Sequence, residues 1–63
     1  MRLIKSSDNN CPSCEEIMIA EYEFKRGITR LQVDCWEGKD KLRENAKQVI
    51  EVCHSCGWSQ KMK

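Results

Sequence analysis

The alternation of hydrophobic and polar positions divides the chain into short extended segments. Residues 17–24 are rich in β-branched and aromatic side chains, and hydrophobic residues alternate with glutamates toward their end. This period of two predicts a half-buried strand. Alternation resumes over 28–36 after the turn Lys25-Arg26-Gly27, in which glycine can adopt a positive φ. We therefore predict that 17–24 and 28–36 form a β-hairpin. One face of its first strand carries Met18, Ala20, Tyr22 and Phe24, and the other carries Glu21 and Glu23.

The second half of the chain carries a charged segment between two further extended stretches. Residues 37–48 are highly charged, with Asp40 near their start and hydrophobic residues at helical spacing. This pattern favours a short helix over about 40–47, and a solvated loop fits it equally well. Residues 49–52 and 58–62 alternate again, so we expect a strand in each.

Two cysteine pairs of identical spacing interrupt this pattern, at Cys11-Pro12-Ser13-Cys14 and at Cys53-His54-Ser55-Cys56. A CxxC pair can hold one face of a metal ion, so two pairs complete a tetrahedral shell around one Zn²⁺. A chain of 63 residues buries too little surface to rely on its core alone, and a structural zinc would supply the missing folding free energy. The predicted metal ligands are Cys11, Cys14, Cys53 and Cys56.

Disulfide bonds are the alternative cross-link that could stabilise so short a chain, and several observations argue against them. The count of five cysteines is odd, and a disulfide within a CxxC pair would close too small a loop to constrain the chain much. Residues 1–5 lack the continuous apolar core of a secretory signal, and no apolar run approaches membrane-spanning length. We therefore expect a reducing, cytoplasmic setting and no membrane association.

The two pairs CPSC and CHSCG, with β-rich segments between and after them, resemble a zinc ribbon. The resemblance implies a small metal-bound β domain in which two knuckles clamp one zinc beside a three-stranded antiparallel sheet. It covers about residues 9–62. We accordingly expect a zinc-ribbon domain over 9–63, preceded by a polar lead-in at 1–8.

Two features depart from the ribbon pattern. Residue 15 is Glu where many ribbons have Gly, so we expect the first knuckle to be looser or differently hydrogen-bonded. A gap of 38 residues also separates Cys14 from Cys53, longer than in compact ribbons. We assign the excess to a charged insertion at about 37–48, either a helix or a loop, between the second and third strands.

Other residues near the predicted site leave alternatives open. A rubredoxin-like iron centre uses the same four thiolates, so the sequence does not choose between zinc and iron. His54 lies between two ligands, and we expect its ring at the surface. Trp58 follows the second knuckle directly, where it can cover the metal. Cys35 shares a predicted strand face with Val33, which favours a buried structural thiol over a reactive or intermolecular one.

The charge of the chain limits the kinds of partner it can bind. One Zn²⁺ on four thiolates converts the formal charge of +1 to about −1. Any contact with DNA or RNA must therefore come from a local patch. The best patch is the predicted hairpin turn with Lys25, Arg26 and Arg30, although charged residues on a small domain often form only a solvated face. Trp36, or else Tyr22, is the candidate for stacking on a base.

No catalytic constellation is visible in the sequence. A closed Cys₄ shell leaves no position for a metal-bound water, and nothing else activates a nucleophile, so we expect no enzyme. Zinc ribbons are widespread in transcription, replication and translation machinery, and the resemblance implies a binding module associated with nucleic acid. The alternative is a protein-binding regulator in a larger assembly, such as an inhibitor of RNA polymerase, without nucleic-acid contact. A free sheet edge, or Cys35, would also permit a homodimer.

Overall fold

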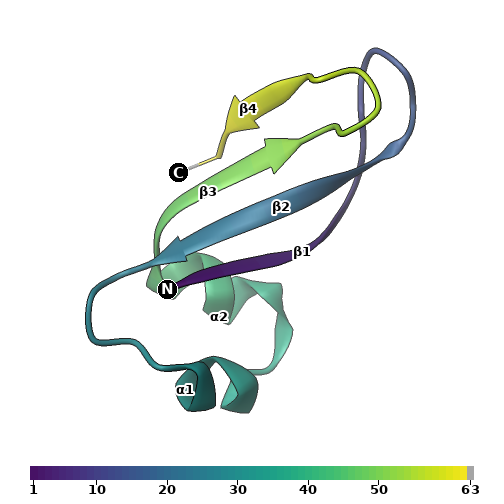
Figure 1. Ribbon diagram of the computed structural model, residues 1–63. Helices are drawn as coiled ribbons and strands as arrows, with labels where there is room; N and C mark the ends of the chain where they lie inside the picture. Colours follow the sequence, from purple (N-terminus) through teal and green to yellow (C-terminus); the bar gives the residue numbers. More distant parts are fainter. Residues whose placement is uncertain (63) are drawn as a thin grey trace.

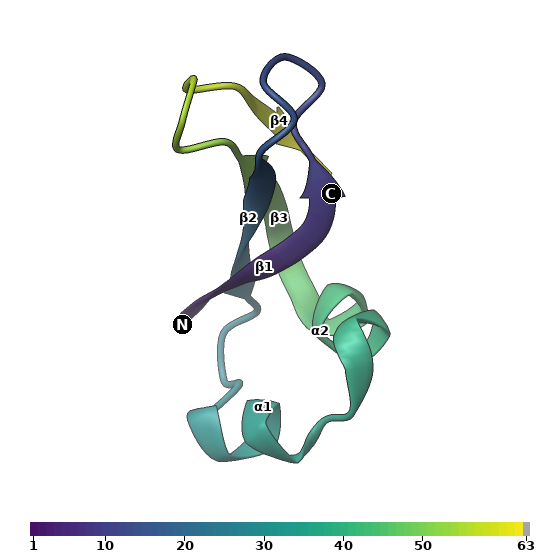
Figure 2. The same ribbon diagram turned by 90° about the vertical axis from the view of Figure 1, so that its right-hand side faces the viewer.

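A computed structural model describes residues 1–62, and its four strands form one antiparallel sheet in the order β1-β2-β3-β4. Two short helices connect β2 to β3 at one end of this sheet, and the loops that carry the cysteine pairs lie at the other end (Figures 1 and 2). No helix within residues 1–62 is long and apolar enough to cross a membrane. The elements are β1 (Arg2–Asn10), β2 (Ile17–Phe24), α1 (Arg30–Cys35), α2 (Gly38–Asn45), β3 (Ala46–Val52) and β4 (Ser59–Lys61).

Strand β2 is confirmed with the predicted bounds. Its even-numbered residues from Met18 to Phe24 are buried, whereas the odd-numbered ones are exposed or half-buried. The strand lies between β1 and β3, so that Tyr22 has Leu3 and Val49 as its neighbours in register. One face of the sheet is therefore apolar across all three strands.

The hairpin predicted for 17–24 and 28–36 is wrong, because α1 replaces its second strand. Thr29 caps this helix with a capping box: its hydroxyl accepts from the N–H of Gln32, and the Gln32 side chain accepts from the N–H of Thr29 at 2.8 Å. These hydrogen bonds satisfy backbone N–H groups that have no partner within the first turn of a helix. The capping box therefore decides the conformation of this segment, and the alternation of hydrophobic and polar residues over 28–36 does not. Of the residues in α1 only Val33 is buried, whereas Leu31 is 79% exposed.

Residues 2–8 of the polar lead-in belong to β1, a strand that was not among those predicted. Leu3 is the one buried residue of this strand, so its side chains give almost no alternating signal. The strand is held by its backbone pairing with β2, from Arg2 opposite Glu23 to Ser6 opposite Ile19. The register then shifts before Asn10, where Asp8 adopts a φ of 62°. The sheet consequently has four strands, not three.

Of the helix and the solvated loop that the sequence leaves open for 37–48, the structure has a helix, α2. Leu42 is its buried residue, and Lys39 near its start pairs with Asp8 of β1. The hydrogen bond and charge of Lys39 hold the pKa of the Asp8 carboxyl below its ordinary value. Lys39 also donates to the carbonyl of Ser6 at 2.7 Å. The insertion is therefore tied to the edge strand as well as packed on the sheet.

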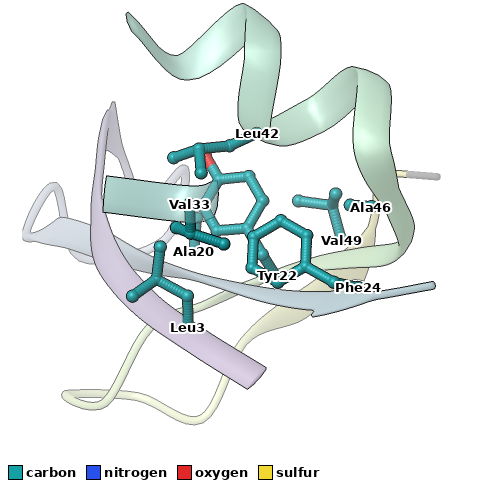
Figure 3. Close-up of a cluster of buried hydrophobic side chains, with 8 residues drawn as sticks. All are labelled: Leu3, Ala20, Tyr22, Phe24, Val33, Leu42, Ala46 and Val49. Atoms are coloured by element: carbon teal, nitrogen blue, oxygen red, sulfur yellow. The ribbon is translucent and has the colours of Figure 1, made fainter. Parts of the chain in front are cut away.

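The main core lies between the helices and the apolar face of the sheet, as Figure 3 shows. The rings of Tyr22 and Phe24 lie nearly parallel, with centroids 6.3 Å apart. Trp36, between the two helices, meets Phe24 edge-on at 5.8 Å, a favourable aromatic geometry. The buried members of this core are Leu3, Ala20, Tyr22, Phe24, Val33, Leu42, Ala46 and Val49.

The two leucines of the helical segment give a matched test of this packing. We expect Leu42→Ala to lower the free energy of unfolding by about 2–5 kcal/mol, because the buried side chain leaves a cavity. The same change at exposed Leu31 should shift it by less than about 0.5 kcal/mol. Chemical denaturation of the metal-loaded variants measures both values. Equal effects at the two positions would contradict the packing of α2 on the sheet.

Candidate metal centre

The two cysteine pairs occupy equivalent turns, one between β1 and β2 and the other between β3 and β4. In the first turn the N–H of Glu15 donates to the carbonyl of Cys11 at 2.9 Å. In the second turn the N–H of Gly57 donates to the carbonyl of Cys53, also at 2.9 Å. Each pair of strands thus ends in a knuckle of the same hydrogen-bonded form.

The expectation that Glu15 makes the first knuckle looser or differently bonded is wrong. Glu15 has a φ of 64° and Gly57 a φ of 81°, so both residues take the left-handed conformation. This conformation costs a non-glycine residue about 1–2 kcal/mol. The Asn10 side chain donates to the carbonyl of Glu15 at 2.7 Å, which supports the strained residue from its N-terminal side.

The four predicted ligands come together at one point. Their sulfur atoms all lie within 4.8 Å of one another, with Cys11 and Cys56 at 3.4 Å and Cys14 and Cys53 at 3.3 Å. A tetrahedron with Zn–S bonds of 2.3 Å has sulfur atoms about 3.8 Å apart. All four cysteines are free thiols. The donor set and its spacing therefore fit one tetrahedral metal ion.

The ligands lie in a second, smaller core. Cys11 and Cys53, the first residue of each pair, are buried with Met18, whereas Cys14 is half-buried and Cys56 is exposed. Trp58 packs against this cluster, which confirms its predicted position over the site. One side of the site is thus apolar, and the other is open to solvent.

Backbone N–H groups and neighbouring thiols set the acidity of the cluster. The N–H of Cys56 is the main cause that lowers the pKa of the Cys53 thiol, to about 6. The N–H of Trp58 acts in the same direction on Cys56, but the thiols of Cys11 and Cys53 outweigh it and raise the pKa of Cys56 to about 12. Four adjacent thiolates repel one another, so a divalent cation is required to hold all of them deprotonated.

A buried carboxylate separates the metal cluster from the main core. Glu51 of β3 is 3% exposed and lies between Val49 of the main core and Cys53 of the metal cluster. Its oxygens accept from the side-chain amides of Asn9 at 2.9 Å and Gln60 at 3.3 Å. Burial acts to raise the pKa of Glu51, but these hydrogen bonds, led by that of Asn9, outweigh it and leave the pKa lowered. Sequence reasoning missed this network, since a strand glutamate usually faces solvent.

The residues predicted to touch a partner are not all available. Lys25 and Arg26 are exposed in the turn after β2, whereas Arg30 on α1 pairs with Asp34 at 3.2 Å. Trp36 is half-buried against the core, and Tyr22 is only 2% exposed. Of the two candidates for stacking on a base, Tyr22 is therefore enclosed in the core, whereas Trp36 keeps part of its surface exposed.

The remaining cysteine and the histidine lie outside the cluster. Cys35 is exposed, so the prediction of a buried structural thiol is wrong. Its side chain leaves the core because residues 30–35 are helical, and Cys35 no longer shares a face with Val33. His54 is exposed, as predicted, and does not belong to the group of four converging ligands.

Comparison with protein-family models, curated proteins and solved structures gives no match. The interpretation of the site consequently depends on its geometry. Four cysteines within metal-binding distance on a small antiparallel β domain are consistent with a zinc ribbon, and they define the protein as a small metal-binding module.

Replacing single cysteines tests the ligand set. We expect Cys53→Ser to lose the bound metal ion and the dispersed NMR spectrum. The substitution removes a buried ligand, and the metal cross-link between the two cysteine turns is lost with it. Cys35→Ser removes an exposed thiol outside the site and should retain one metal ion per chain. Native mass spectrometry and amide NMR measure both properties. A well-dispersed spectrum from metal-free wild-type protein would refute the structural role of the ion.

The Glu51 network gives a second stability test. Glu51→Gln should lower the free energy of unfolding by about 1.5–3 kcal/mol, because it removes a charged acceptor and turns an amide toward two donors. Glu37→Gln, an exposed change of the same kind next to α2, should cost less than about 0.5 kcal/mol. Denaturation of both metal-loaded variants supplies the comparison. A neutral result for Glu51→Gln would mean that water replaces the network without cost.

Proposed function

We propose that the protein is a non-enzymatic zinc-ribbon module in which one Zn²⁺ has a structural role. The observation that carries this proposal is the convergence of four cysteine sulfurs within 4.8 Å. Four thiolates close the coordination shell and leave no position for a reacting water. When bound, the ion supplies the cross-link between the two knuckles. An iron centre would use the same ligands, but its absorption in the visible range distinguishes it from the d¹⁰ zinc ion.

We further propose that the module binds nucleic acid through the end of the sheet that carries the helices. Residues 24–48 contain seven Lys or Arg and four Asp or Glu, a formal charge of +3. Within the described residues, neither Lys25 nor Arg26 takes part in an ion pair. These two cations are free to meet phosphate groups, which gives the local patch that a molecule of net charge near −1 requires.

The character of this contact follows from the side chains around it. Tyr22 and Trp36 are held in the core, so we do not propose that they stack on bases. Contacts made by lysine and arginine alone are directed at the phosphate backbone and carry little sequence preference. Binding of this kind is weakened strongly by salt, since it depends on the release of counterions. The role that fits is that of an accessory module in transcription or replication machinery.

A protein-binding regulator, for example an inhibitor of a larger enzyme such as RNA polymerase, is the second candidate function. The observation that favours it is a sheet face with exposed isoleucines, among them Ile4 at 59% and Ile17 at 63% exposure. Large exposed apolar residues grouped on one face are typical of an interaction surface.

Fluorescence anisotropy with mixed-sequence single- and double-stranded oligonucleotides at two salt concentrations tests the nucleic-acid proposal. The zinc-loaded protein should bind at low salt and lose affinity as salt increases. The double variant Lys25→Ala/Arg26→Ala should lower the slope of log affinity against log salt by about 2. Lys5→Ala/Lys61→Ala makes the same change in net charge elsewhere and should leave the slope unchanged. Absence of binding, or equal effects of the two variants, would refute the proposal.

A further inference from the structure

The register shift in β1 is a bulge with a strained residue at its centre. Ser6 lies opposite Ile19 and Asn10 lies opposite Ile17, so four steps along β1 match only two steps along β2. We call the three residues between Ser6 and Asn10 the bulge. Asp8, in the middle of the bulge, has a φ of 62°. This left-handed conformation is unfavourable for a residue with a Cβ atom, so other contacts must hold it.

Contacts with two other elements hold the bulge in place. The hydroxyl of Ser7 donates to the carbonyl of Met18 in β2 at 3.1 Å and accepts from the N–H of Asn9 at 3.2 Å. The ammonium group of Lys39 in α2 pairs with the carboxylate of Asp8. A strained segment that is fixed by this many contacts points to a role for the segment in the working of the protein.

The bulge directs the side chain of Asn9 across the sheet. The amide of Asn9 donates to a carboxylate oxygen of Glu51 at 2.9 Å. The strands of these two residues, β1 and β3, are not neighbours, because β2 lies between them. The residue of β2 opposite Glu51 is Ala20, whose short side chain lets the contact pass over β2. Bulges in strands commonly re-aim a side chain in this way.

Glu51 receives a second hydrogen bond from the other edge of the sheet. Gln60 of β4 lies opposite Glu51 in register, and its amide donates to the second carboxylate oxygen at 3.3 Å. The charge of Arg43 on α2 favours the carboxylate as well. Glu51 is only 3% exposed. One buried carboxylate therefore joins β1 and β4, two edge strands that do not pair with each other.

The hydrogen bond between Asn9 and Glu51 joins equivalent positions of the two knuckles. Asn9 lies two residues before Cys11, and Glu51 lies two residues before Cys53. These two cysteines are the buried members of the ligand set. A fixed separation between Asn9 and Glu51 consequently limits how far the two buried sulfurs can move apart.

We propose that Glu51 is a positioning residue for the metal centre. Its hydrogen bonds with Asn9 and Gln60 hold the two knuckles at the separation that coordination by four thiolates requires, and they thereby slow the release of the ion. The inference rests on the structural zinc proposed above and names a residue outside the ligand set that controls its retention. Altering groups that orient metal ligands typically changes metal affinity by about 10–100-fold.

An exchange of hydrogen-bond donor and acceptor tests the proposal. Glu51→Gln turns an amide toward one of the two donors and should speed zinc release about tenfold. In Asn9→Asp/Glu51→Gln the new amide donates to the new carboxylate, and its carbonyl oxygen still accepts from Gln60. This double variant keeps the shape of both side chains and moves the charge to position 9, which is exposed. It should return the release rate to within about threefold of the wild-type rate.

The rate is measured as transfer of zinc to a chromophoric chelator, at concentrations where the rate no longer depends on the chelator. A double variant that releases zinc as fast as Glu51→Gln would overturn the proposal. If Glu51→Gln retains no zinc at all, the double variant decides by the same criterion, and retention restored to one ion per chain supports the proposal.

Leu42→Ala separates positioning from a loss of overall stability. Leu42 lies in the main core, and its truncation destabilises the fold at least as much as Glu51→Gln does. It should change the release rate by less than about threefold, because it shares no contact with the knuckles. Equal acceleration by Leu42→Ala and Glu51→Gln would overturn the proposal.

The zinc content of the wild-type protein distinguishes failure of this inference from failure of the proposed function. Native mass spectrometry measures it before the kinetic experiments. Wild-type protein that holds no zinc would refute the structural metal, and the role of Glu51 with it. One zinc ion per wild-type chain, with an unchanged release rate in Glu51→Gln, would refute the role of Glu51 alone.

Discussion

The arrangement of four cysteine sulfurs around one point is the constraint on which the rest of the structure depends. A chain of this size has two small cores, and the one at the metal end consists of few residues besides the ligands themselves. Without the ion, mutual repulsion between thiolates would act against the approach of the two knuckles. When the ion is bound, it fixes the turn between β1 and β2 to the turn between β3 and β4. The end of the sheet that lies away from the helices is thereby held together.

The two cores share one side of the sheet and are separated by a polar layer. Glu51 accepts hydrogen bonds from β1 and β4 across the width of the sheet, so the carboxylate links both edge strands to the centre. Lys39 links α2 to β1 in a similar way. Because these contacts and both cores lie on one side, the opposite side of the sheet remains available for binding.

The sequence predicts which four cysteines converge and predicts the fold in part. The spacing of the cysteines requires no knowledge of tertiary structure, and β2 and α2 have clear periods. The failure at 30–35 has a local cause, since the Thr29–Gln32 capping box starts a helix there, whereas the prediction of a strand used only the alternation over 28–36. Strand β1 could not be found by periodicity, because an edge strand with one buried residue is specified by its backbone partners. The choice between Tyr22 and Trp36 as a contact residue depends on packing for a related reason, as only the folded structure shows that Tyr22 is buried and Trp36 half-buried.

The connectivity of the sheet has a consequence for how the site assembles. Each cysteine pair lies in the turn of its own two-stranded unit, β1–β2 or β3–β4, and each unit is formed by residues close together in the chain. Pairing of this kind has a low contact order and closes only short loops. Each turn can therefore present two cysteine ligands in a preformed arrangement before the ion binds. The ion can bind first to one cysteine pair, and the second pair can then dock onto it. This route is shorter than one in which four separate thiolates must be brought together.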